Sequence, residues 1–354
     1  MLVTGILFEQ SCQIYFNSKK PPSDQFCSID GLKIHYVKKG TGGPTVVFQS
    51  GLGGDYKIWD EIQNAVSRQT TTISYDRAGL QWSEKSDKSR TLESMTRELS
   101  QLLEKTNCPK PYILVGHSLA GITLRPFIRN NQKDVAAVIF ADVSHPLQIK
   151  KSSEGLKKYL VTPPGWLISI LMETGIARTY FGIKPFMADL PVSHWMNKHV
   201  RDYFYKSYQT FLKEAQDDDP MFEQAEAISS FGTIPVTVIS GAYPEGADFL
   251  GEKSLADEYL KIHREGQKDL LNLSSISKQV IAPNSGHYVP LQPRGDVLRA
   301  VPRRACFHSR RQGRIHPIRL RARRGLRCHV ALGLHQARGT LFAPARSVSH
   351  LQGR

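Results

Sequence analysis

A single serine lies where the sequence predicts a strand that runs into a helix without a loop. The apolar run at residues 112–116 leads directly into His117 and Ser118, and the residues that follow have helical spacing. So sharp a turn exposes the serine hydroxyl above the sheet and strains the backbone, and it needs small residues where strand and helix nearly touch. Gly116 and Ala120 meet that need. The pattern predicts Ser118 as a nucleophile.

A nucleophilic serine requires a base, and His287 has the best context among the twelve histidines. It follows a late predicted strand in a Ser-Gly-His turn and comes after the serine in the chain. His117 is too close to Ser118 in sequence to face it and is expected to be structural. Of the others, His35 is assigned to an early hairpin strand, and His145, His194, His199 and His263 are assigned to the cap or to helix surfaces.

The carboxylate that would orient the base has three candidates. Asp142 directly follows a buried apolar run, at the carboxyl end of the predicted sheet, where open α/β proteins build their sites. Asp248 lies eight residues beyond Ser240, the last residue of the following predicted strand, and just ahead of a predicted helix. Glu245 lies in the same segment. The residues alone leave the choice open.

The elements that must position these groups alternate along the chain. Short apolar runs, many of them β-branched, are separated by 10 to 20 residue segments with helical spacing; the runs are LKIHYV, TVVFQ, TTISY, YILVG, AAVIF, IPVTVIS and KQVIA. Strands of this kind are buried on both faces, as in a parallel sheet covered by helices on both sides. The predicted fold class is α/β, with a doubly wound, mostly parallel sheet.

One interval breaks the alternation. Residues 146–232 contain no convincing strand and instead carry helical segments rich in aromatic residues and Met. We interpret them as a helical cap inserted between two strands. The predicted organisation is an N-terminal extension at 1–27, a core at 28–145 and 233–296, the cap at 146–232, and a tail at 297–354.

Three motifs together resemble the α/β-hydrolase superfamily. GHSLAG is similar to its nucleophile elbow, G-x-S-x-G, with Ala120 in place of the second Gly. PTVVFQSGLGGDYKIWD resembles the segment that carries the first oxyanion donor. By resemblance, the backbone N–H groups of Leu52 and Leu119 are the two donors. ISYDRAGLQWSEKS resembles a structural turn of the family, in which Asp76 and Arg77 stabilise the fold, although Gln81 and Trp82 replace its second Gly region.

The resemblance covers about residues 28–293 and implies a carboxylesterase-like serine hydrolase that acts through an acyl-enzyme. Asp142 begins a D-x-S-H-P string that resembles one found in some relatives. By this resemblance Asp142 is favoured as the acid, with Asp248 second and Glu245 third. No metal or organic cofactor is expected; the partners are a small ester and water. Lactonase, thioesterase, amidase or acyltransferase chemistry on the same fold stays open, as does a non-catalytic binding protein. The aromatic, Met-rich cap favours apolar acyl groups of short to medium length.

Charge and composition change abruptly near residue 294. The net charge of the 354-residue chain is +15, but residues 294–354 hold 15 Arg, no Lys and one acid, Asp296, so they carry +14 of it. Arg, Ala, Leu, Gly and His dominate this tail and no period persists. Residues 297–354 are therefore expected to be disordered or foreign to the fold. Nucleic-acid binding is not expected, because the tail lacks Lys and has scarcely any aromatic residues.

The N-terminus and the cysteines indicate no special chemistry. The opening MLVTGILF is an apolar run of eight residues, too short to span a bilayer, and it lacks the basic segment and cleavage site of a signal peptide. A soluble or cytoplasmic protein without a transmembrane segment is expected. The five cysteines have no metal-ligand spacing and are interpreted as free thiols.

Overall fold

The computed structural model describes residues 2–21, 23, 25–160, 162–187, 190–216, 218–242, 252–291 and 295–301. The chain divides into two units, Met1–His308 and Ser309–Arg354. The described residues all belong to the first unit, which holds the elements and the site below. Asp248 and Glu245 lie outside the described residues, and so does the predicted tail beyond residue 301. The start of that tail was assigned wrongly: residues 297–300 are helical, and Val297 is buried in an apolar cluster of the core.

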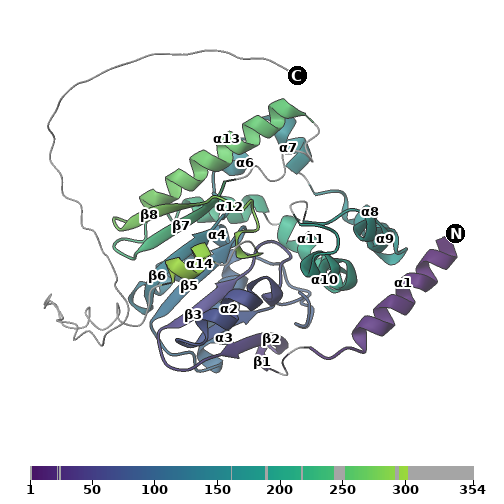
Figure 1. Cartoon of the computed structure of the whole chain (residues 1–354), viewed down its shortest axis with the longest axis horizontal. Coiled ribbons are helices and arrows are strands. Elements are labelled where there is room, and N and C mark those ends of the chain that lie inside the picture. Colours follow the sequence, from purple (N-terminus) through teal and green to yellow (C-terminus); the bar gives the residue numbers. More distant parts are fainter. Residues whose placement is uncertain are drawn as a thin grey trace, which may run out of the picture. The chain divides into compact units, whose positions relative to one another are not determined.

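Within the described residues, eight strands form one sheet in the order β1-β2-β4-β3-β5-β6-β7-β8 (Figure 1). The pairs β1/β2 and β2/β4 are antiparallel, and the other pairs are parallel. This is the predicted doubly wound, mostly parallel sheet. The strands are β1 Phe26–Ile29, β2 Leu32–Lys39, β3 Thr45–Gln49, β4 Thr72–Tyr75, β5 Tyr112–His117, β6 Val135–Ala141, β7 Val236–Gly241 and β8 Ser277–Ala282. The sequence pattern began near residue 30 and missed β1.

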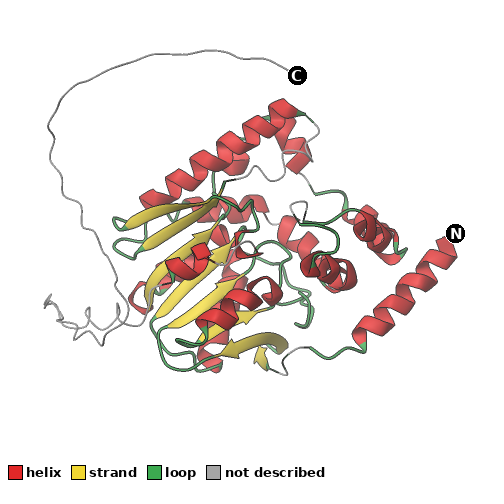
Figure 2. Ribbon diagram, viewed as in Figure 1, coloured by secondary structure: helices red, strands yellow, loops and turns green. Residues whose placement is uncertain are grey.

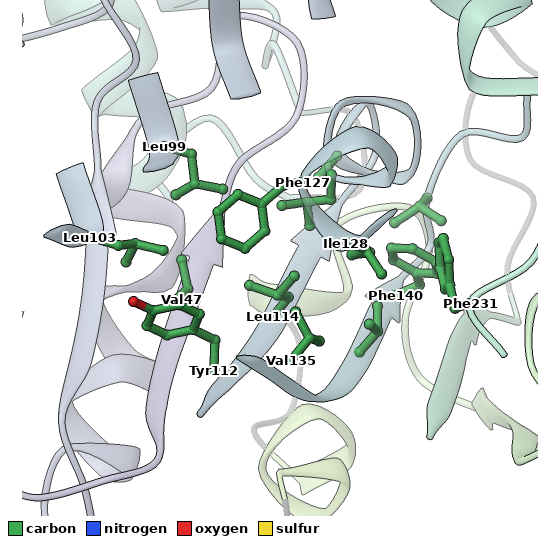
Figure 3. Packing of buried hydrophobic residues seen from close by; sticks show 14 of the residues in the cluster. Val47, Leu99, Leu103, Tyr112, Leu114, Phe127, Ile128, Val135, Phe140 and Phe231 are labelled. Carbon is green, nitrogen blue, oxygen red and sulfur yellow. The ribbon is translucent and has the colours of Figure 1, made fainter. Parts of the chain in front are cut away.

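The central strands are buried on both faces, because their side chains alternate between two apolar layers. Val46 and Phe48 of β3 belong to one cluster, with residues of α2 (Asp60–Val66) and α14 (Gly295–Ala300). Val47 points to the opposite cluster, with residues of α3 (Leu92–Lys105) and α5 (Arg125–Asn130). Figure 3 shows part of this second cluster, in which Leu99, Leu103 and Phe127 pack beside Val47.

Helix α3 illustrates how the sequence determines such a layer. Thr91 caps its first turn by accepting a hydrogen bond from the N–H of Ser94, which satisfies one of the free donors at the helix start. Its apolar residues recur at helical spacing, so that one stripe faces the sheet. All members of the predicted stripe are buried: Leu92, Met95, Leu99, Leu102 and Leu103.

The described residues between β6 and β7 form helices and no strand (Figure 2). This agrees with the expected run of helices, and the division into core and cap stays a proposal. The helices are α6 Gln148–Lys151, α7 Glu154–Leu160, α8 Gly165–Glu173, α9 Ile176–Ile183, α10 Trp195–Tyr203, α11 Tyr208–Gln216 and α12 Asp218–Glu226.

The remaining helices are α1 Leu2–Asn17, α4 Ala120–Thr123 and α13 Lys253–Asp269. Short 3-10 turns add η1 Tyr56–Trp59, η2 Gln132–Asp134, η3 Phe204–Lys206, η5 Leu270–Leu273 and η6 Val289–Leu291. In the part of the chain that the structure describes, no helix combines the length and the apolar character needed to cross a bilayer.

Candidate active site

Ser118 lies between β5 and α4 with a φ of 54°, in the left-handed region that L-residues avoid. Such a conformation costs roughly 1–3 kcal/mol and persists only when close packing enforces it. A Cβ on Gly116 would lie 2.8 Å from atoms of both Ala120 and Leu124. A Cβ on Gly121 would lie 2.5 Å from a backbone oxygen. Strand and helix therefore touch through small residues, and the serine is held in the turn between them.

The turn after β3 approaches this serine closely. A Cβ on Gly51 would lie 2.6 Å from Ser118 Cβ and 3.1 Å from its Oγ. Within the described residues, neither the N–H of Leu52 nor that of Leu119 has a hydrogen-bond acceptor. Leu119 follows Ser118 in the chain, and Leu52 belongs to the turn that approaches it. Both N–H groups, which have no acceptor among the described residues, thus lie near the serine, as an oxyanion site requires.

A buried arginine fixes the geometry of that turn. Arg77 donates to the backbone oxygens of Ser50 and Gly51, each at 2.7 Å, and forms a two-pronged ion pair with Glu214 at 2.7 and 2.8 Å. Glu214 also accepts the N–H of Gly53 at 3.0 Å. Burial alone would raise the pKa of the Glu214 carboxyl, but the charge of Arg77 outweighs it and holds the pKa below its usual range. These contacts are consistent with the fold-stabilising role expected for Arg77.

His287 follows β8 and meets Asp142 at the end of β6. Its Nδ1 lies 2.8 Å from Asp142 Oδ2. The other carboxylate oxygen, Oδ1, accepts the N–H of Gly241 at 2.9 Å and lies 3.2 Å from His263 Nε2. Like Ser118, Asp142 has a positive φ, 48°.

The surroundings keep the Asp142 carboxyl ionised. Burial alone would raise its pKa, but the hydrogen bonds and electrostatic interactions with His263 and His287 outweigh it and lower the pKa. An ionised carboxylate can only accept, so His287 carries its proton on Nδ1. That tautomer leaves Nε2 of His287 as the acceptor that a general base needs.

His117 supports the same histidine from the other side. Its Nε2 lies 2.8 Å from the backbone oxygen of His287, to which it donates, and the two rings are 4.6 Å apart. Burial and the nearby His287 lower the pKa of His117 to about 3, so its ring is neutral near pH 7. The structural role expected for His117 is thus one of positioning.

A cavity of about 230 Å³ brings these groups together, and both Ser118 and His287 line it. Gly51 and Leu52 contribute the turn after β3. Much of the remaining wall is apolar and comes from the helical segment between β6 and β7: Phe186, Met187, Met196, Val200, Phe204 and Phe211. Ser118, His287 and Leu52 therefore line one largely apolar space.

The same cavity has a second polar cluster that sequence reasoning missed. His199 Nε2 lies 2.8 Å from Asp55 Oδ2 and 3.1 Å from Gln81 Nε2. Burial alone would raise the pKa of Asp55, but the charge of His199 outweighs it and lowers the pKa. Gln81 has a φ of 45° where the family pattern has Gly. The Gln in place of Gly was a sequence signal that could have drawn attention to this cluster. No spacing or pattern in the sequence links His199 to Asp55.

Three histidines assigned to the cap or to helix surfaces make specific contacts. His199 lines the cavity, His263 of α13 reaches Asp142, and His145 is buried with its Nε2 2.9 Å from Asp269. A surface position was wrong for His145, which lies in the buried loop after β6, and for His263, because the packing of α13 turns its ring toward Asp142. His199 does lie in the segment assigned to the cap. Within the described residues no group of three or more metal-ligating side chains occurs.

Comparison with known proteins adds relatives to this geometry. The chain is 29% identical over 116 residues to the uncharacterized protein YqjL of Bacillus subtilis (strain 168), a match that covers 32% of this chain and 46% of YqjL. The chain thus spans less than half the length of that relative.

Two solved structures resemble the chain at the level of the fold. The Cif epoxide hydrolase from Acinetobacter nosocomialis has a TM-score of 0.60 and 17% identity, with 83% of this chain and 95% of that chain covered. A thermophilic esterase from Thermogutta terrifontis has a TM-score of 0.55 and 17% identity, with 78% and 96% covered.

A family model described as alpha/beta hydrolase fold matches residues 44–289. That range includes Ser118, Asp142 and His287. The chain belongs to the alpha/beta hydrolase fold family.

Proposed function

We propose that this chain is a serine hydrolase that cleaves carboxylic esters through an acyl-enzyme. The observation that carries the proposal is the 2.8 Å contact between Asp142 and His287 beside a cavity that Ser118 also lines. A serine alone is a weak nucleophile, and an oriented histidine is the usual means of activating it. Ser118 is the proposed nucleophile, His287 the base and Asp142 the acid that orients it.

In the first half-reaction, His287 Nε2 removes the proton of the Ser118 hydroxyl while Oγ attacks the ester carbonyl carbon. The carbonyl oxygen becomes an oxyanion, which receives hydrogen bonds from the N–H groups of Leu52 and Leu119. Collapse of this intermediate breaks the bond to the alcohol oxygen. The departing alcohol takes the proton from His287, and the acyl group stays on Ser118.

In the second half-reaction, His287 removes a proton from water, which attacks the acyl carbonyl and releases the carboxylic acid. This step separates ester cleavage from epoxide opening. Attack of Ser118 on an epoxide would leave an alkyl ether, which has no carbonyl for water to attack, and turnover would stop. The serine therefore favours acyl substrates over the reaction named for the epoxide hydrolase neighbour.

The substrate class follows from the cavity wall. We propose that residues 146–232 form a cap over the core, because Met196, Phe204 and Phe211 from this segment line the cavity beside Ser118. Apolar side chains offer no partner for a charged acyl group, so acyl chains that are apolar and of short to medium length are favoured.

The test is hydrolysis of a p-nitrophenyl ester series from acetate to octanoate by wild type, Ser118→Ala and His287→Ala. Both variants should lose turnover by several orders of magnitude while circular dichroism shows an unchanged fold, since nucleophile and base act as one unit. An initial burst of p-nitrophenol from wild type would report the acyl-enzyme. Retention of near wild-type turnover by either variant would refute the assignment, and no hydrolysis of any ester by wild type would favour a non-catalytic binding protein.

A further inference from the structure

Exposed apolar side chains are concentrated on helices α1, α8 and α9. Among the described residues, sixteen large apolar side chains are exposed, and eleven of them lie on these three helices. Leu2, Ile14, Trp166 and Ile183 are each more than 60% exposed. A soluble protein rarely leaves such a concentration in water, so this surface, the docking face, is expected to contact a partner.

The three helices form one continuous surface. Helix α1 contacts α8, and α8 contacts α9 (Figure 1). An apolar groove of about 660 Å³ joins α1 to α9, lined by Leu2 and Phe8 on one side and by Ile176, Tyr180 and Ile183 on the other. The exposed apolar residues therefore belong to one face with a groove along it.

The docking face is almost free of charge. Its helices contain three charged residues. Two of them, Glu9 and Arg178, are buried, and Nε and Nη2 of Arg178 each donate to a carboxylate oxygen of Glu9 at 2.7 Å. The third, Glu173, accepts a hydrogen bond from Tyr208 at 3.0 Å. Because Glu9 is buried and paired with Arg178, helix α1 exposes no charged side chain on the docking face.

Four lysines flank these helices along the chain, while Asp202 lies 3.9 Å from Arg178 and is paired with Arg201. Lys19 and Lys20 follow α1, Lys184 follows α9, and Lys158 precedes α8, all exposed. An apolar centre with a border of lysines matches an anionic lipid surface, where acyl chains meet negative headgroups. Trp166 and Tyr180 have the amphipathic rings that prefer this boundary.

We propose that the docking face binds the surface of an anionic lipid bilayer. The position of Phe186 supports a bilayer over a protein partner: it lies three residues after the end of α9, is 40% exposed, and lines the cavity that Ser118 also lines. The docking face and the cavity thus lie close together along the chain, as a site that takes apolar molecules from a bilayer requires. Binding to lipid does not depend on catalysis by Ser118, so the two proposals fail separately.

Trp166 provides a direct probe. It is 66% exposed, whereas Trp59 is fully buried and Trp82 and Trp195 are partly buried. The full chain is mixed with vesicles of phosphatidylcholine and phosphatidylserine that contain brominated phosphatidylcholine, which quenches tryptophan on contact. Quenching is expected in wild type, and most of it should be lost in Trp166→Phe.

The matched variants separate apolar contact from charge. Leu7→Glu/Ile183→Glu places two charges on the docking face, and Ile276→Glu/Ile281→Glu places two at exposed apolar positions elsewhere. Binding is measured by co-sedimentation with vesicles at about 0.5 M salt. At this concentration charges interact over only a few Å, which suppresses binding through the Arg-rich tail. The first variant should bind at least ten times more weakly than wild type, and the second should bind like wild type.

Three results would overturn the proposal. One is that wild type fails to bind vesicles at this salt concentration. Another is that both double variants bind equally well. The third comes from light scattering without lipid: if wild type is a dimer that Leu7→Glu/Ile183→Glu converts to a monomer, the docking face pairs with a second copy of the chain.

Discussion

Replacement of Asp142 by Asn tests the site most sharply, because the surrounding donors determine how the amide must lie. The N–H of Gly241 donates to Oδ1 at 2.9 Å, and His263 Nε2 lies 3.2 Å from the same atom. In Asp142→Asn the amide oxygen must therefore stay at the Oδ1 position. Its NH₂ then takes the Oδ2 position, 2.8 Å from His287 Nδ1.

The expected loss of activity follows from that placement. Two donors would face each other unless His287 moves its proton from Nδ1 to Nε2. The proton on Nε2 then faces the serine, so the ring cannot accept the proton of the Ser118 hydroxyl. A base locked in the wrong tautomer lowers kcat by about 10⁴-fold in a serine hydrolase with intact geometry.

The assay is kcat for p-nitrophenyl butyrate, with Asp269→Asn as the matched control. Asp269 pairs with His145 at 2.9 Å in a similar Asp–His contact, but neither residue lines the cavity that Ser118 lines. The kcat of Asp269→Asn should therefore stay within a fewfold of wild type. A loss of less than tenfold for Asp142→Asn, together with a large loss for Asp248→Asn or Glu245→Gln, would refute the reasoning and place the acid after β7.

Three further substitutions test the supporting structure. Glu214→Gln removes the buried counter-charge of Arg77 and should lower the free energy of unfolding by about 3–5 kcal/mol in urea titrations; a change below 1 kcal/mol would contradict the importance of the pair. Gly121→Ala puts a Cβ 2.5 Å from a backbone oxygen and should lower Tm. In the control Gly155→Ala, in helix α7, the new Cβ lies 3.4 Å from the Leu255 side chain, so Tm should stay the same or rise. The lowered pKa of His117 means that, between about pH 6.5 and 3, the unfolded chain binds a proton that the folded chain excludes. The free energy of unfolding should therefore decrease as the pH is lowered through this window, and it should decrease less steeply in His117→Asn. Parallel curves for the two proteins would refute the assignment.

The fold and the strained turn at Ser118 could be predicted because their determinants are local. Each predicted apolar run corresponds to a strand from β2 to β8, since burial on both faces leaves a continuous apolar segment in the sequence. Ser118 was recognisable because the elbow, with its small residues, occupies a few consecutive positions. β1 was missed because it has only four residues, two of them polar or small, and lies at the sheet edge.

The rest of the site depends on contacts between distant segments. Asp142 and His263 are 121 residues apart, and Asp55 and His199 are 144 apart. No periodicity or spacing encodes which helix surface turns toward the end of β6. Sequence could place Asp142 among three acids but could not reveal that its carboxylate serves two histidines.

The buried pair of Arg77 and Glu214 joins two parts of the molecule that the sequence separates by 137 residues. Glu214 belongs to α11, in the helical segment between β6 and β7, yet it accepts the N–H of Gly53 in the turn beside Ser118. Arg77 holds the carbonyls of Ser50 and Gly51 in the same turn. A displacement of α11 would leave the Arg77 charge buried without its partner, which is costly, and would release the turn that precedes Leu52. The position of this helix and the conformation of the turn that carries the proposed oxyanion donor are therefore coupled through one ion pair, and we expect substrate contacts with α11 to influence the proposed catalysis without touching the serine.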